Sequence, residues 1–122
     1  MIKLTFCLIR APHLSREAFQ HYWFNTHGPL VASVAEDLQI RRYVQAHSLP
    51  ADVNTEVRAA RAAPAEYDGV AELWFDSLEA VAANAQRPEA RAAGALLLED
   101  ERRFIDLSKS PLWWSEDRTI VG

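Results

Sequence analysis

Residues 22–31 read Tyr-Trp-Phe-Asn-Thr-His-Gly-Pro-Leu-Val, an aromatic cluster that runs through a histidine into a Gly-Pro pair. We predict that this stretch ends a helix that begins near Ser15, whose side chain is a good N-cap. In such a helix Phe19, Trp23 and His27 are each about one turn apart and share one side, which should pack on the core. The pattern alone leaves His27 balanced between a structural residue and a residue of a functional site.

Gly28 and Pro29 are predicted to break this first helix. A proline disfavours the helical conformation for the residue before it, and it can open a new helix at its own position. We therefore expect one helix over residues 15–27 and a second, short helix over residues 30–36.

Three other segments alternate between two sets of side chains, as β-strands do when successive residues point to opposite faces. They are residues 2–9, 40–48 and 68–76. The 50–67 connection between the second and third strands is rich in alanine and charge, and should hold one or two helical turns near residues 53–62.

The last third of the chain is predicted to hold two helices and a fourth strand. Ser77 can cap a helix over residues 78–86, and Pro88 can open another that runs to about residue 104, with Gly94 as a point of interruption. Residues 105–108 are predicted as a short strand, followed by a terminal extended segment through residue 121.

The resulting order, strand-helix-strand-strand-helix-strand, is that of the ferredoxin-like α+β fold, and we expect one domain over residues 1–122. Such a sheet carries helices on one face only. The strands at 2–9 and 68–76 nevertheless supply large apolar side chains to both faces. We therefore expect a homodimer in which two sheets pack face to face, with residues 113–121 reaching over the seam.

Composition disfavours several classes of function. The formal net charge of −4 would repel nucleic acid, and no apolar run approaches the ~20 residues that a membrane span needs. The N-terminus lacks the features of a signal peptide, so we expect a cytoplasmic protein. Cys7 is the only cysteine, and the four histidines share no metal-ligand spacing, so we expect neither a disulfide nor a bound metal.

One acidic cluster needs its own interpretation. Residues 99–101 are Glu-Asp-Glu and are followed by two arginines, a pattern typical of a solvated helix face with mixed charge. We therefore do not expect a metal site at this cluster.

A pocket is expected between the first helix and the sheet, with His27, Tyr43, Arg41 and His47 as its polar candidates. A histidine can exchange a proton with a ligand, and a tyrosine hydroxyl can orient a carbonyl or stabilise an enolate. Together they would support enolisation, dehydration, decarboxylation or isomerisation without a cofactor. The same pattern fits a core tyrosine with its hydroxyl at the rim, an exposed arginine and a solvated His47.

The chain resembles the EthD family of the dimeric α/β-barrel superfamily over almost its whole length. The similar blocks are residues 23–31, 42–45, 67–77, 100–104 and 110–113, which include Trp-x-x-x-His-Gly-Pro and Gly-x-x-Glu-x-Trp-Phe. The resemblance implies a ferredoxin-like protomer, a dimer whose sheets form a barrel, and a pocket in each protomer. It places the pocket histidine at His27 and the tyrosine at Tyr43, with Trp23, Leu73 and Phe75 as walls.

Three hypotheses about function remain open, because a fold can be inherited without its reaction. The first is an enzyme that acts on a small aromatic, lactone or polyketide-like molecule by cofactor-independent acid–base chemistry, of the isomerase or lyase type. The second is a non-catalytic protein that binds an apolar metabolite or accompanies an oxygenase. The third is a cofactor-free monooxygenase. The predicted catalytic residues are His27 and Tyr43, and the predicted ligand-binding residues are Phe19, Trp23, Arg41, His47, Leu73 and Phe75.

Overall fold

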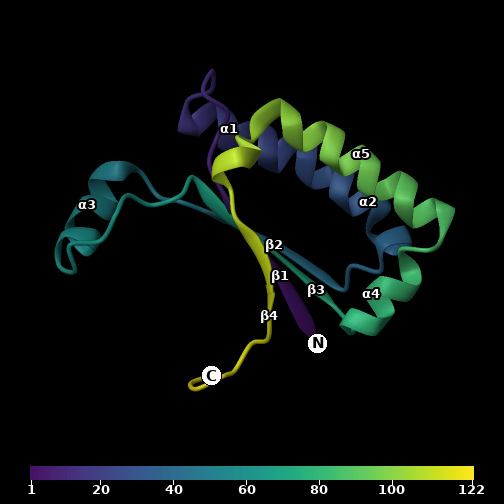
Figure 1. Ribbon diagram of the computed structural model, residues 1–122. Helices are drawn as coiled ribbons and strands as arrows, with labels where there is room; N and C mark the ends of the chain where they lie inside the picture. Colours follow the sequence, from purple (N-terminus) through teal and green to yellow (C-terminus); the bar gives the residue numbers. More distant parts are fainter.

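The computed structural model describes residues 1–122 and contains one four-stranded antiparallel sheet (Figure 1). Its strands are β1 (Ile2–Leu8), β2 (Arg42–His47), β3 (Gly69–Phe75) and β4 (Leu112–Ser115), in the spatial order β2-β3-β1-β4. Strand β1 is central, because Leu4 lies opposite Leu73 of β3 on one side and Trp114 of β4 on the other. The first three strands confirm the predicted ones to within two residues at each end.

Helices α1 (Arg16–Tyr22), α2 (Gly28–Leu38) and α5 (Pro88–Phe104) lie over the same face of the sheet (Figure 1). Helix α4 (Leu78–Asn84) follows β3 directly, and α3 (Ala51–Ala59) projects away from the sheet on its long connection. Ser15 and Ser77 cap α1 and α4 as predicted, since each hydroxyl accepts a hydrogen bond from the amide three residues later. Gly94 does not interrupt α5. The arrangement is the ferredoxin-like fold.

The core forms between this helix layer and the alternate residues of the central strands. Phe6 and Leu8 of β1 pack with Phe19, Trp23 and Phe104 from the helices. Phe19 and Trp23 have ring centroids 5.6 Å apart, and Phe19 and Phe104 have theirs 5.5 Å apart. The first strand therefore turns the side chains of its even-numbered residues toward the helices, and these are the residues that its alternation placed together on one face.

Gly69 is required by the close approach of this helix layer to the sheet. A Cβ at this position would meet the six-membered ring of Trp23 on one side and the carbonyl oxygen of Ala46 at 2.9 Å on the other. Trp23 itself is 1% exposed. The first residue of β3 thus leaves the space that the tryptophan ring fills.

Gly28 and Pro29 do not break the helix, contrary to the prediction. One turn of π-helix, η1 (Trp23–His27), joins α1 to α2, and the Gly28 amide donates to the carbonyl of Trp23, five residues earlier. Pro29 has no N–H to place in the helical ladder, and the wider π turn leaves room for its ring. The restriction on the residue before a proline is a preference, and it yields here to packing around a continuous helix.

The π turn also determines which side of the helix carries His27 and Val31. Phe19, Trp23, His27 and Val31 are spaced by four residues, and all four are buried. An α-helix turns every 3.6 residues, so a strict spacing of four would drift around its surface. The wider turn at 23–27 absorbs this drift and keeps His27 and Val31 on the side that faces the sheet.

The predicted strand at residues 105–108 is wrong. Ile105 makes only an isolated bridge with Arg10, and residues Leu107–Lys109 form a short 3-10 helix, η2. Local side-chain bonds favour this turn, because the Ser110 hydroxyl donates to the Asp106 carbonyl and accepts from the Ile9 amide. The fourth strand is instead β4, inside the segment predicted only as extended.

The sheet face opposite the helices is mixed in character. Val44, Val70 and Trp74 lie on it, and Trp113 of β4 is 48% exposed there. Lys3 crosses the same face and pairs with Glu72 at 2.7 Å. None of the helices combines the length and the apolar character needed to span a membrane.

Candidate functional site

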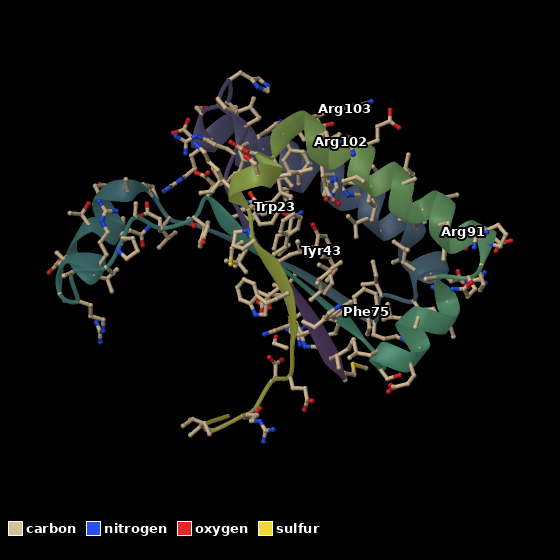
Figure 2. The ribbon with its side chains drawn as sticks, viewed as in Figure 1. Trp23, Tyr43, Phe75, Arg91, Arg102 and Arg103 are labelled. Carbon is tan, nitrogen blue, oxygen red and sulfur yellow. The ribbon has the colours of Figure 1, made fainter.

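Tyr43 lines two separate hollows. An inner cavity of about 50 Å³ lies between the sheet and the helix layer, and an outer pocket of about 480 Å³ opens beside η1 and α2. Figure 2 shows Trp23 and Tyr43 in the space between sheet and helices. The inner cavity is lined by Phe6, Leu8, Trp23, His27, Val31, Tyr43, Ala71, Leu73, Leu97, Glu101 and Ile105. The outer pocket is lined by Phe24, Asn25, Gly28, Pro29, Ala32, Tyr43, Gln45 and His47.

The buried carboxylate of Asp100 holds the ring of His27 in place. The ring's Nδ1 lies 2.7 Å from Oδ2 of Asp100, whose other oxygen accepts a hydrogen bond of 2.6 Å from the Tyr22 hydroxyl. Burial lowers the pKa of His27 below its ordinary value, and the hydrogen bond and charge of Asp100 oppose this in part. The neutral ring therefore places its proton on Nδ1, facing the carboxylate, and leaves a lone pair on Nε2.

The free nitrogen of His27 faces open space. Every fully buried polar side-chain atom in the protein has a hydrogen-bond partner, whereas Nε2 of His27 has none. Nε2 therefore retains some accessible surface, and the hollow that His27 lines is the inner cavity. A neutral imidazole nitrogen fixed in this way is suited to accept a proton from a group in that cavity.

Tyr43 is oriented by a short polar chain along β2. Gln45 Nε2 donates to the Tyr43 hydroxyl oxygen at 2.8 Å and to the Trp23 carbonyl at 2.9 Å. The Gln45 carbonyl oxygen in turn lies 2.8 Å from Nε2 of His47, whose ring stacks on Trp23 at 4.5 Å. Because Gln45 supplies a donor to the Tyr43 oxygen, the hydroxyl proton of Tyr43 is free to donate to a ligand.

Glu101 is the second ionisable group of the inner cavity. Its carboxyl makes no hydrogen bond and no ion pair, and it lies among largely apolar lining residues beside His27 and Tyr43. Burial, and after it the negative charge of Asp100, raises the pKa of Glu101 to about 7. Burial likewise raises the pKa of Tyr43, so its hydroxyl keeps its proton at neutral pH.

The EthD domain matches residues 11–108 of the chain, which contain His27, Tyr43 and Glu101. The chain belongs to the EthD family. Among solved structures, an EthD family protein from Bacillus halodurans is 20% identical with a TM-score of 0.62, covering 97% of this chain and 99% of that one. An EthD-like protein from Ralstonia eutropha is 19% identical with a TM-score of 0.57, covering 94% and 89%. A dimeric protein of unknown function and ferredoxin-like fold from Bacteroides fragilis is 14% identical with a TM-score of 0.58, covering 95% of each chain.

The site of this EthD protein brings together five of the eight predicted residues. His27, Tyr43, Trp23 and Leu73 line the inner cavity, and His47 lines the outer pocket. Tyr43 is the predicted residue that lines both hollows.

The other three predicted residues lie outside both hollows. Phe19 is fully buried in the core behind Trp23. Phe75 lies nearer to α4 (Figure 2) and packs against Trp114, with ring centroids 5.5 Å apart. Arg41 precedes β2 and is exposed. It pairs with Asp76 at 2.8 Å on the protein surface.

Asp100, Glu101 and Gln45 are the residues that the sequence prediction missed. The cluster at 99–101 was interpreted as a solvated face, but Asp100 is 5% exposed and Glu101 lines the cavity. A signal was present in the sequence. The buried residues Ala90, Ala93, Leu97 and Phe104 of α5 follow helical spacing, and Asp100 and Glu101 lie within that stripe.

No group of three His, Cys, Asp or Glu side chains is arranged to hold a metal ion. The polar groups of the site instead form two separate sets, one around His27 and one along β2.

Proposed function

We propose that this EthD protein is a small enzyme that performs acid–base chemistry, without a cofactor, on a small aromatic, lactone or polyketide-like carbonyl compound. The observation that carries the proposal is the arrangement at His27. Its Nδ1 is held by Asp100, and its Nε2 is free at a largely apolar cavity that Tyr43 also lines. A positioned base beside a positioned hydroxyl donor is the minimum needed to form an enolate from a carbonyl compound.

In the proposed step His27 Nε2 removes a proton from the carbon next to the ligand's carbonyl group. The electron pair of the broken C–H bond moves into the new C=C bond of the enolate, and the negative charge develops on the carbonyl oxygen. Tyr43 donates a hydrogen bond to that oxygen, and Asp100 stabilises the imidazolium that forms. Return of the proton from the His27 imidazolium to another carbon gives isomerisation. If the same proton goes instead to a β-hydroxyl, that group leaves as water, the enolate electrons form the C=C bond, and the outcome is dehydration.

Hydrogen–deuterium exchange tests this step without knowledge of the natural substrate. The probe is 2-acetonaphthone, an aromatic methyl ketone whose methyl protons exchange in D2O through the enolate and are counted by NMR. We expect the wild-type protein to accelerate the exchange and His27→Gln to lower the rate by about 100-fold or more. His13→Gln, which changes an exposed histidine, is the matched control. Equal exchange in the wild-type and His27→Gln proteins would make His27 structural.

The outer pocket favours a second candidate function, a binding or accessory protein for an apolar metabolite. Its volume of about 480 Å³ lies in the range of small-molecule sites, and Phe24 and His47 offer aromatic surfaces there. Binding of 2-acetonaphthone without accelerated exchange would support this alternative. Oxygen uptake on addition of a phenolic compound would instead support the cofactor-free monooxygenase.

The outer face of the sheet supports a homodimer as the working form of the protein. Val44, Val70 and Trp74 lie on a face that no helix of the same chain covers, and Trp113 adds an exposed indole. A second copy packed face to face would cover these side chains. Light scattering at micromolar concentration tests this proposal, and a monomeric mass would contradict it.

A further inference from the structure

We propose that Glu101 enters the inner cavity as a neutral acid and donates a hydrogen bond to the ligand's carbonyl oxygen. The site would then select neutral carbonyl compounds and reject carboxylates. This inference rests on the proposed function for the class of ligand, and it adds the group that recognises that class.

The position of Glu101 on α5 is the first observation that supports its proposed role. Asp100 and Glu101 are adjacent, and successive residues of a helix point about 100° apart. Asp100 therefore reaches His27 from the side, whereas Glu101 lines the same cavity as His27 and Tyr43. The two consecutive carboxyl groups have different tasks because they point in different directions.

The second observation is that the Glu101 carboxyl has no hydrogen-bond or ion-pair partner. Arg102 and Arg103 follow it in the sequence, but both are exposed, and Arg103 pairs with Asp100 at 3.6 Å and with Glu99 at 3.7 Å. No protein donor satisfies the Glu101 carboxyl. Glu101 is half-buried, and a half-buried carboxyl without a partner is costly when ionised and can donate to a ligand when it is neutral.

The third observation is the charge of the groups that surround Glu101. Asp100 faces it from the same helix with a negative charge, His27 faces it from η1 as a neutral ring, and Tyr43 faces it from β2 with its proton retained. Strands β1 and β3 contribute only apolar side chains to the lining. The cavity lining therefore holds no cation, and Arg103, which lies outside the lining, pairs with Asp100 at 3.6 Å. A carboxylate ligand would find no compensating charge inside the cavity.

The sizes of the two hollows indicate how such a ligand would lie. The inner cavity of about 50 Å³ has room for a small group such as a carbonyl and its neighbouring carbon. The outer pocket of about 480 Å³ has room for a ring system, and Tyr43 lines both. The carbonyl end would lie inward, near Glu101, with the ring outward against Phe24 and His47.

Two nearly isosteric probes test the selection. 2-Acetonaphthone carries a methyl ketone where 2-naphthoate carries a carboxylate, and the affinity of each can be measured by fluorescence from about pH 5.5 to 8.5. We expect the wild-type protein to bind the ketone at least tenfold more weakly at the upper pH than at the lower one. The naphthoate should bind at least tenfold more weakly than the ketone throughout.

Variants assign the pH dependence to one group. Glu101→Gln keeps a neutral donor at every pH, so its affinity for the ketone should not vary with pH. Glu99→Gln, which removes an exposed carboxylate from the same helix, should keep the wild-type dependence. His27→Gln should keep it as well, because the dependence belongs to Glu101. If Glu101→Gln fails to fold, the 13C signal of the Glu101 carboxyl in the wild-type protein replaces it, and should titrate at higher pH when the ketone is bound.

The inference is overturned by a dependence that survives in Glu101→Gln, by a Glu101 carboxyl signal that the ketone does not shift, by equal binding of the two probes, or by a ketone that does not bind. The proposed function fails separately. A ketone that binds with the expected pH dependence but exchanges no methyl protons would refute the enzyme and leave the role of Glu101 standing.

Discussion

Replacing Glu101 by glutamine should make the stability of the protein less dependent on pH. Burial and the charge of Asp100 raise the pKa of Glu101 from its ordinary value of 4.5 to about 7. Below about pH 4.5 the carboxyl is neutral in the folded and unfolded chains alike. Between pH 4.5 and about pH 7 the unfolded chain loses the Glu101 proton while the folded chain keeps it, so the wild-type protein loses stability as pH rises. Glutamine has no proton to lose.

The size of this effect follows from the two pKa values. A difference of one pKa unit corresponds to about 1.4 kcal/mol, so the shift of Glu101 corresponds to about 3 kcal/mol when it is fully expressed. The stability of Glu101→Gln relative to the wild type should therefore rise by up to about 3 kcal/mol between about pH 4 and pH 8. Urea denaturation followed by tryptophan fluorescence measures this difference at each pH.

The matched control is Glu99→Gln, which removes a carboxylate from an exposed position of the same helix. It should not show the pH-dependent gain. A difference between Glu101→Gln and the wild type that stays constant over the whole range would refute the reasoning, because it would mean that the Glu101 carboxyl is as well solvated in the folded chain as in the unfolded one.

Three further predictions concern other parts of the molecule. Asp100→Asn removes the charge that partly offsets burial, so the pKa of His27 should fall further below its ordinary value, and NMR titration of the histidine ring protons would show an unchanged or higher pKa if this is wrong. Gly69→Ala places a Cβ against the Trp23 ring and should destabilise the fold by about 2 kcal/mol or more in thermal denaturation. A melting temperature equal to that of the wild type would mean that the ring has room to move. Trp113→Lys puts a charge on the outer sheet face and should shift the proposed dimer toward monomer in light scattering, and an unchanged mass would place the interface elsewhere.

The sheet and the long helix could be predicted because their signals are repetitive. Alternation placed the side chains of Phe6 and Leu8 on one face of the first strand, and Pro88 marked the first residue of α5. The errors fall where one local rule met a tertiary constraint. Gly28 and Pro29 look like a break, and only the packing of Trp23 and His27 on the sheet shows that a π turn continues the helix.

The candidate site was predictable in part for a related reason. His27 and Trp23 stand in an aromatic stripe with one helical spacing, so their shared side was visible in the sequence. Glu101 was not, because its neighbours Glu99 and Arg102 suggest a solvated helix face. Whether a helical carboxyl lines a cavity depends on the distance to the opposite sheet, and sequence patterns do not contain that distance.

The position of a bound ketone tests the central claim most directly. A crystal structure of the protein with 2-acetonaphthone should place the carbonyl oxygen in the inner cavity, within hydrogen-bonding distance of Tyr43 or Glu101, and the methyl carbon beside Nε2 of His27. A ketone seated wholly in the outer pocket, with the inner cavity unchanged and His27 out of reach, would contradict the account.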